Sequence, residues 1–186
     1  MKLAVLGIGQ IAPELLAAVQ QRLVRVLPDC ICSVMGDVLA VPEHAYDRKR
    51  NQYNSTVILV DVDSYARGRN GFDRVLGVVD VDVYALGLNY VFGEAYAPGR
   101  AGLISLWRLR PEFYHEEANL GLFAIRIVKE AAHEVGHTLG LPHCTHSYCV
   151  MHFSNSIFEV DKKQSFFCDQ CYLNASTAIV NMEQPV

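Results

Sequence analysis

The sequence predicts an α/β (α+β) fold in which a mixed sheet with its helices precedes one long helix and a small, irregular C-terminal subdomain. Apolar runs typical of buried strands alternate with helical patterns in the first half of the chain. Helical periodicity then extends from about residue 116 to residue 139, and the pattern after residue 140 is irregular and rich in cysteine. The 186 residues therefore suit one domain, with residues 1–140 holding the sheet and the long helix and residues 141–186 the subdomain.

The expected elements follow in chain order. Leu3–Gly9 is an apolar strand, and Pro13 begins a helix whose buried side carries Leu15, Leu16, Val19, Leu23 and Val26. Residues 42–55 are polar and predict a solvated loop or helix edge. The further strands are expected at Ile31–Met35, Thr56–Val62, Val75–Tyr84, Tyr90–Tyr96 and Ala101–Arg108, followed by a helix over Glu116–Leu139 and a last helix from about Cys168.

Composition excludes several classes of protein. Hydrophobic residues make up 51% of the chain and charged residues 19%, which is typical of a globular protein. A net charge of −4 without a run of Lys or Arg argues against nucleic acid as a partner. No apolar run is long enough to span a membrane, and the N-terminal strand lacks the cleavage site of a signal peptide. We therefore expect a cytoplasmic protein.

The strongest motif is HExxHxxGxxH, which runs from His133 to His143. Residues four apart on an α-helix lie about 6 Å apart and differ by about 40° around its axis, so His133 and His137 can bind one zinc ion. Glu134 lies about 100° further round, beside the metal, where a general base for the attacking water belongs.

The third histidine requires the helix to end. In a continued helix His143 would lie about 9 Å beyond His137, out of reach of a shared ion. Gly140 can adopt the left-handed conformation that ends helices, and Pro142 prevents continuation. Three neutral histidines then leave one tetrahedral position open, as a catalytic zinc site requires.

Four cysteines predict a second zinc site. Cys144 and Cys149 follow the third histidine, and Cys168 and Cys171 form a CxxC pair. Four thiolates make a closed tetrahedral site that serves structure, and metal binding can supply folding energy to a segment without a large apolar core. A nucleic-acid-binding zinc ribbon is disfavoured by the acidic charge.

Together these motifs resemble the archaemetzincins, a branch of the metzincin zinc metallopeptidases. The matching pattern is HExxHxxGxxHC from His133, then CxM at residues 149–151, then CxxC ending at Cys171. Asn89–Ala95 is also similar to the strand region upstream of the motif in that family. The resemblance implies a metzincin-like mixed sheet, an active-site helix and a second zinc ion in the C-terminal subdomain.

The resemblance also implies a role for each matching residue. Catalytic zinc would be held by His133, His137 and His143, with Glu134 as general base and then acid. Met151 would form the Met-turn, an apolar platform beneath the histidines that is not a ligand. The sheet strand nearest the cleft, within Tyr90–Leu109, would bind an extended substrate along its edge. The structural zinc would be held by Cys144, Cys149, Cys168 and Cys171.

We therefore expect an enzyme with two zinc ions that hydrolyses peptide or protein substrates through a metal-activated water and Glu134. The alternative is a zinc-stabilised peptide-recognition module with little or no catalytic activity. The presence of Glu134 speaks against that alternative, because a structural site needs no base beside its metal. Endopeptidase and aminopeptidase action both stay open, as do the substrate and the oligomeric state.

A third hypothesis comes from the N-terminal turn. Gly7-Ile8-Gly9-Gln10-Ile11-Ala12 fits the dinucleotide-binding pattern GxGxxA, with Asp29 and Asp37 as possible ribose partners. Short glycine-rich turns are common, and no second mononucleotide-binding half follows. We therefore disfavour an oxidoreductase.

Other polar residues have simpler interpretations. We interpret Asp61, Asp63, Asp80 and Asp82 as polar strand termini or loop anchors, and His115 with Glu116 and Glu117 as the start of the long helix. His146 and His152 could be further ligands or substrate contacts, but surface or hydrogen-bonded roles are favoured. Cys30 and Cys32 fall outside the zinc pattern and are expected to be core thiols.

Overall fold

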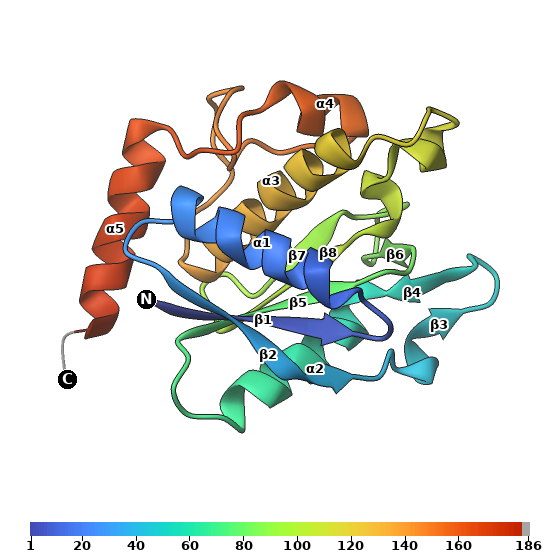
Figure 1. Cartoon of the computed structure of the whole chain (residues 1–186), viewed down its shortest axis with the longest axis horizontal. Helices are drawn as coiled ribbons and strands as arrows, with labels where there is room; N and C mark the ends of the chain where they lie inside the picture. The colour runs from blue at the N-terminus through green and yellow to red at the C-terminus, as the bar shows by residue number, and fades with distance from the viewer. Residues whose placement is uncertain (184–186) are drawn as a thin grey trace.

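A computed structural model describes residues 1–183 of the chain (Figure 1). Strands, α-helices and short 3-10 helices (η) alternate along it. In chain order they are β1 (Lys2–Ile8), α1 (Pro13–Val26), β2 (Ile31–Leu39), η1 (Glu43–Ala45), β3 (Tyr46–Asp47), β4 (Gln52–Asn54), α2 (Ser55–Arg67), β5 (Arg74–Val79), β6 (Val83–Tyr84), β7 (Gly93–Ala95), β8 (Ala101–Ser105), η2 (Trp107–Leu109), η3 (Pro111–Tyr114), α3 (Leu120–Thr138), α4 (Ile157–Lys162) and α5 (Asp169–Glu183).

The main sheet is mixed, as the sequence predicted. Its five strands lie in the order β2-β1-β5-β8-β7, and all pairs are parallel except β7 with β8. Strand β7 is last in this order, so it forms one edge of the sheet. There it contacts α3. A second, smaller sheet has the order β3-β4-β6.

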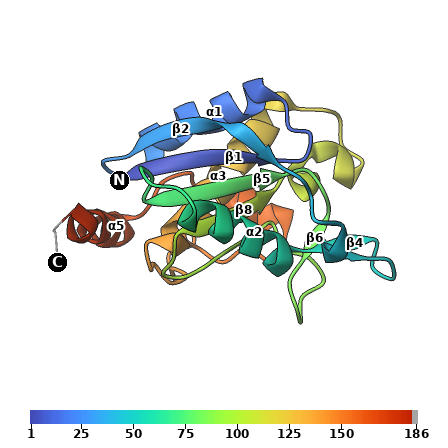
Figure 2. The same ribbon diagram turned by 90° about the horizontal axis from the view of Figure 1, so that it is seen from below.

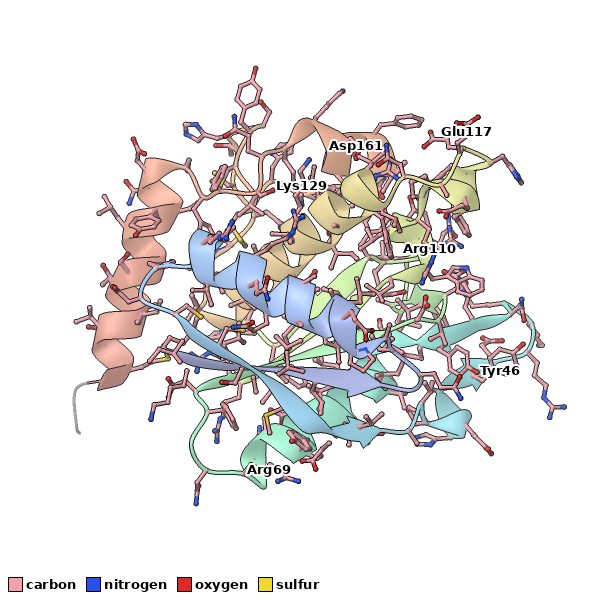
Figure 3. The ribbon with its side chains drawn as sticks, in the orientation of Figure 1. Tyr46, Arg69, Arg110, Glu117, Lys129 and Asp161 are labelled. Carbon is pink, nitrogen blue, oxygen red and sulfur yellow. The ribbon has the colours of Figure 1, made fainter. Side chains whose placement is uncertain are left out.

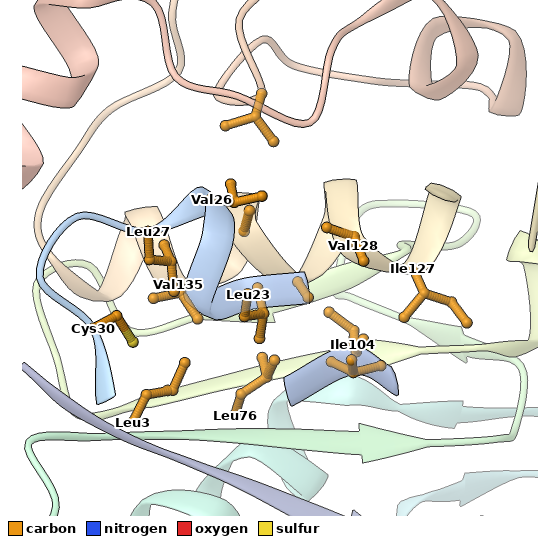
Figure 4. Packing of buried hydrophobic residues seen from close by; sticks show 14 of the residues in the cluster. Leu3, Leu23, Val26, Leu27, Cys30, Leu76, Ile104, Ile127, Val128 and Val135 are labelled. Atoms are coloured by element: carbon orange, nitrogen blue, oxygen red, sulfur yellow. The ribbon is translucent and has the colours of Figure 1, made fainter. Parts of the chain in front are cut away.

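Helices cover both faces of the main sheet (Figure 2). Alternate residues of a strand point to opposite faces, so Leu3 and Val5 of β1 lie in the core with α1 and α3, whereas Ala4 and Leu6 lie in the core with α2. Figure 4 shows Leu23 of α1 above Leu76 of β5 in the first of these cores. That core also includes residues beyond position 140, so the two predicted parts of the domain share one apolar interior.

The strand predicted at Thr56–Val62 is wrong, because this segment forms α2. Its β-branched residues suggested a strand, but Ile58, Leu59 and Val62 recur at helical spacing and are all buried. The side chain of Asn54 caps the helix by accepting a hydrogen bond from the Thr56 backbone N–H (3.0 Å). Tertiary burial of one helical face therefore outweighs the strand propensity of the residues.

Two aspartates belong to this helix rather than to a strand end. Asp63 accepts a hydrogen bond from Arg67, one turn later on α2, at 2.6 Å. Asp61 lies on the same helix. On a strand, two residues at positions i and i+2 would share one face. On a helix they do not face each other, so Asp61 and Asp63 do not form a pair.

The predicted strand Val75–Tyr84 is interrupted. Strand β5 ends at Val79 and β6 begins at Val83. Asp80 forms a bidentate ion pair with Arg110 (2.5 and 2.6 Å), and Asp82 forms one with Arg108 (2.6 and 2.8 Å). Asp80 and Asp82 therefore anchor the loop, as the sequence predicted. The break between β5 and β6 lets the chain pass from the main sheet to the smaller one.

The long helix begins at Leu120, later than predicted. Asn119 is its N-cap and accepts a hydrogen bond from the Leu122 backbone N–H at 2.9 Å. Glu116 and Glu117 precede the helix, and His115 has the left-handed φ of 62° at the end of η3. The helix α4 was not predicted, since its six residues are too few to show a period.

None of the helices within residues 1–183 is long and apolar enough to cross a membrane. The glycines of the N-terminal turn are explained by packing alone. A Cβ at Gly7 would lie 3.2 Å from Leu16, and Gly9 has a φ of +73° with Val41 3.0 Å from the position of a Cβ. Close packing accounts for this pattern without a bound dinucleotide.

Candidate metal centres and cleft

Three histidines meet at the end of α3, and we refer to His133, His137 and His143 as the histidine cluster. Their candidate ligand atoms all lie within 4.8 Å of one another. The Nε2 atoms of His133 and His137, one helical turn apart, are separated by 3.1 Å. Helix geometry therefore supplies two members of the cluster, and the chain beyond the helix returns the third.

The return depends on how α3 ends. Gly140 has a φ of +87°, a conformation that side chains other than glycine rarely adopt. Its N–H donates to the His137 carbonyl (2.8 Å), and the Leu141 N–H donates to the Gly136 carbonyl (3.1 Å). These bonds satisfy carbonyls at the helix end and direct residues 141–143 back across it.

Backbone carbonyls orient two of the rings. The Nδ1 of His133 lies 2.8 Å from the Val150 carbonyl oxygen, and the Nδ1 of His137 lies 2.8 Å from that of Leu141. A carbonyl can only accept, so each Nδ1 carries the proton and each Nε2 keeps its lone pair for a metal. The sequence alone did not identify these orienting groups, because they are backbone atoms.

The donor set fits zinc. Nitrogen ligands about 2.05 Å from a tetrahedral zinc ion are about 3.3 Å apart, close to the 3.1 Å between His133 and His137. Burial lowers the pKa of His133 well below its usual value, and it also lowers the pKa of His137 and His143, with the charge of Lys163 adding to each shift. All three rings are therefore neutral near pH 7, the form that binds metal.

Glu134 lies beside the cluster and is buried. Burial raises the pKa of its carboxyl group well above the usual value, and the nearby charge of Glu130 raises it further. Among residues 1–183, no side chain or backbone group donates a hydrogen bond to this carboxylate. A carboxylate in this state is well suited to accept and release a proton.

The edge strand β7 passes directly over Glu134. A Cβ at Gly93 would lie 2.6 Å from the Glu134 Cγ, so only glycine permits this approach. Gly93 was missed as a site residue, although a glycine inside a predicted strand is a signal of close backbone approach.

A cavity of about 280 Å³ opens beside the histidine cluster. Its walls are mostly apolar and come from the segment before β7, from α3 and from the segment after Met151. The lining residues are Ala85, Leu88, Tyr90, Val91, Phe92, Gly93, Glu94, Ala95, Glu130, His133, Glu134, His137, His143, Phe153, Ser154 and Asn155. All three histidines and Glu134 thus face one cleft bounded by the edge of the sheet.

Met151 is fully buried beneath α3. A Cβ at Gly136 would lie 2.4 Å from its sulfur, so the thioether packs against the helix between the first two histidines of the motif. This close packing explains the glycine at position 136.

Four cysteines form a second group, which we refer to as the cysteine cluster: Cys144, Cys149, Cys168 and Cys171. Their sulfur atoms all lie within 4.8 Å of one another, and Cys144 is 3.8 Å from Cys168. Sulfur ligands about 2.3 Å from a tetrahedral zinc ion are about 3.8 Å apart, so this group also fits zinc. Backbone N–H groups of His146 and Cys168 donate to Cys144 (3.4 Å) and Cys149 (3.3 Å), as suits thiolates.

The remaining candidates lie outside both clusters. Cys30 and Cys32 are buried in the first core, where burial raises the pKa of each thiol, to about 11 and about 12. His146 is exposed, and His152 places its Nδ1 2.9 Å from the Cys144 carbonyl oxygen. Within residues 1–183, neither histidine joins a group of candidate metal ligands.

Comparisons with known proteins agree with this geometry. Residues 21–176 match the model of peptidase family M54. The chain is 42% identical over 171 residues to the archaemetzincin of Methanocaldococcus jannaschii, covering 92% of this chain and 90% of that protein. The crystal structure of the Methanopyrus kandleri archaemetzincin superposes with a TM-score of 0.82 at 35% identity, covering 97% of this chain and 96% of the other.

A second similar structure is that of a zinc-dependent peptidase from Methanocorpusculum labreanum. It superposes with a TM-score of 0.84 at 29% identity and covers 93% of this chain and 99% of the other. The structural similarity thus extends over more than nine tenths of the chain.

Proposed function

Because the chain belongs to peptidase family M54 and is a zinc metallopeptidase that carries out zinc-dependent peptide hydrolysis, we propose how its own residues do so. His133, His137 and His143 hold the catalytic zinc ion through Nε2, and Glu134 moves the proton. The cysteine cluster holds a second, structural zinc ion. The observation that carries this proposal is the position of Glu134, a buried carboxylate beside three neutral imidazoles in one cleft.

A zinc ion held by His133, His137 and His143 would supply Lewis-acid chemistry to the scissile carbonyl group and to the attacking water. Glu134 accepts the proton from that water and then donates it to the leaving nitrogen. The raised pKa supports both steps, since a carboxyl group with a pKa nearer neutrality is a better base and, once protonated, an effective acid at the same pH.

The edge of β7 supports binding of an extended peptide. The Ser105 N–H donates to the Phe92 carbonyl (2.8 Å), and the Tyr96 N–H donates to the Ala101 carbonyl (3.1 Å). Backbone groups alternate in direction along an antiparallel strand, so those of Gly93 and Ala95 point to the free edge. A substrate added along this edge passes over Glu134 with its backbone bound and its side chains free to enter the cavity.

The cysteine cluster supports the second part of the proposal. It lies among the segments after α3 and the start of α5, and no cysteine lines the cleft. A closed site of this kind stabilises residues 141–183 and sets the position of His143, the residue directly before Cys144.

The test is cleavage of a diverse peptide library by the zinc-loaded protein, read by mass spectrometry, beside Glu134→Gln. We expect the variant to keep two zinc ions by metal analysis and to lose turnover by roughly 10²–10⁴-fold. Glu117→Gln is the matched control, because Glu117 is an exposed carboxylate before α3 that does not line the cleft (Figure 3). Equal turnover by Glu134→Gln and Glu117→Gln would contradict the role of Glu134.

A further inference from the structure

A buried ion pair lies at the wall of the cleft, where its carboxylate partner Glu130 is a lining residue. Glu130 precedes Glu134 by one turn of α3, and its side chain is 4% exposed. The Nζ of Lys163, which follows α4 and has a fully buried side chain, lies 2.9 Å from the Glu130 Oε1. Buried charges are costly to desolvate and are found where they are paired or have a specific role.

Neighbouring contacts hold the pair in place. The Lys163 Nζ also donates to the His152 carbonyl at 3.4 Å. On the adjacent turns of α3, Arg126 forms a bidentate pair with Asp161 (2.8 and 2.7 Å), and Lys129 donates to the carbonyls of Val160 (2.9 Å) and Asp161 (3.0 Å). Figure 3 shows Lys129 on α3 and Asp161 on α4 in this region. Because these contacts already attach α4 to α3, the attachment does not by itself explain a second ion pair, one that is buried at both ends.

The pair leaves hydrogen-bonding capacity unused. Although Lys163 is close to the Glu130 Oε1, the two groups are not aligned for a hydrogen bond, and this oxygen has no hydrogen-bond partner among residues 1–183. The buried Ser154 Oγ has none either. Both residues line the same cavity as the histidine cluster. A buried polar atom without a partner costs free energy that a ligand group can recover.

The rest of the cavity offers little polarity. Leu88, Tyr90, Phe92 and Phe153 form apolar walls around Glu130 and Ser154. A substrate side chain that enters this cavity therefore meets apolar surface along its length and two unsatisfied polar groups.

We propose that Glu130, Lys163 and Ser154 form a specificity subsite for a substrate side chain that is uncharged and ends in a hydrogen-bond donor, with glutamine as its best representative. The inference rests on the proposed function, because it assumes that peptides occupy this cleft. A carboxamide NH₂ donates to the Glu130 carboxylate, and its carbonyl accepts from the Ser154 hydroxyl. Glu130 thereby gains a hydrogen bond in addition to its ion pair with Lys163, and the Ser154 hydroxyl gains the partner that it lacks.

Charge and shape exclude the other side-chain classes. An acidic side chain would face the Glu130 carboxylate. A basic one would bring a second cation beside Lys163, which already compensates Glu130. An apolar side chain of equal size would fill the cavity and leave both polar groups buried without partners.

The experiment measures binding to the zinc-loaded Glu134→Gln protein, which binds peptides without turnover. Each position of one peptide in turn carries Gln, Met, Glu or Lys, and isothermal titration calorimetry gives the Kd. We expect one position at which Gln binds roughly tenfold more tightly than Met, which matches its size without a donor, and more tightly than Glu or Lys. Equal binding of the Gln and Met peptides at every position would overturn the proposal.

Two further variants locate the preference in these residues. Ser154→Ala removes a hydroxyl that has no partner, so the fold is retained and the Gln preference falls. The double substitution Glu130→Leu with Lys163→Leu replaces the buried pair by apolar groups, and we expect it to reverse the preference in favour of Met. Lys129→Met is the matched control, because Lys129 bridges the same two helices without lining the cavity. A preference that Lys129→Met abolishes as completely as Ser154→Ala would also overturn the proposal.

The readout separates this inference from the proposed function. If wild-type protein cleaves peptides and the Gln preference is absent, the subsite is wrong and the peptidase mechanism stands. If the Gln preference is present and wild-type protein cleaves no library peptide, the subsite stands and the proposed peptide hydrolysis in this cleft is wrong.

Discussion

The histidine and cysteine clusters adjoin in the chain, since His143 and Cys144 are consecutive, yet they differ in chemistry. The histidine cluster has three donors and lines the cleft, whereas the cysteine cluster has four donors and does not line it. Three donors leave one tetrahedral position for a reacting group, and four leave none. The comparison teaches that the number of donors and their access to the cleft, rather than the metal they fit, separate a catalytic from a structural site.

The two clusters also depend on different parts of the fold. One helical turn places His133 and His137, and two backbone carbonyls orient them. The cysteines come from loop segments and the start of α5, far apart in sequence. We therefore expect changes in the histidine cluster to affect turnover most, and changes in the cysteine cluster to affect folding most.

The largest expected effect is that of His137→Ala. Loss of one of three donors removes the catalytic metal, so kcat/KM should fall by at least about 10³-fold, the scale of losing the principal catalytic group. The melting temperature should change little. Metal analysis should find one zinc ion per chain, and a variant that still binds two would remove His137 from the ligand set.

Cys171→Ser tests the cysteine cluster, where we expect stability rather than turnover to change most. Removing a donor from the closed site should lower the free energy of unfolding by about 2–5 kcal/mol, because metal binding there contributes to folding. Urea denaturation measures the loss, and Cys32→Ser is the control, since Cys32 is a buried cysteine outside the cluster. Turnover should fall less than in His137→Ala. A Cys171→Ser protein as stable as wild type would show that the cluster has no structural role.

Binding of a peptide hydroxamate tests whether the two clusters differ in their access to a ligand. This chelator needs an open position on the metal, so it should bind the histidine cluster and not the cysteine cluster. At 100 times its Kd it should stabilise the wild-type protein by about 2.7 kcal/mol and leave His137→Ala unaffected. Thermal shift measures both. Equal stabilisation of the two proteins would place binding elsewhere and favour a zinc-stabilised recognition module.

The smallest effect is a pH dependence in protein from which a mild chelator has removed only the histidine-bound zinc. Burial lowers the pKa of His133 and His137, so the unfolded chain takes up protons below about pH 6.5 that the folded chain does not. The free energy of unfolding should therefore decrease as pH falls from 7 towards 5.

The raised pKa of Glu134 acts in the opposite direction, because the folded state then binds the extra proton. The measurement is thus clearest in a Glu134→Gln background, by urea denaturation at each pH. With zinc restored, metal and protons compete for the same histidine nitrogens. The free energy of unfolding should then depend more steeply on pH. A stability that is constant between pH 7 and pH 5 in the zinc-depleted variant would contradict burial of these rings.

Local sequence patterns correctly predicted much of the secondary structure of this protein. The strand at β1, the helix that Pro13 begins and the end of α3 at Gly140 were all predicted correctly. The same rules failed at Thr56–Val62, where β-branched residues form a helix, and at Glu116, where the helix begins four residues later at Leu120. In both places an asparagine N-cap sets the start of the helix, and at Thr56–Val62 burial of one helical face also outweighs strand propensity.

The sequence by itself determined the two clusters of candidate metal ligands, because helical spacing, a helix-ending glycine and cysteine pairs are local properties of the chain. Only the tertiary structure decided what surrounds them. Glu130 and Lys163 are 33 positions apart in sequence, and Gly93 lies far from Glu134 along the chain, so no periodicity links them. Their proximity follows from the packing of α4 and of β7 against α3, and that packing depends on the whole apolar core rather than on any one segment.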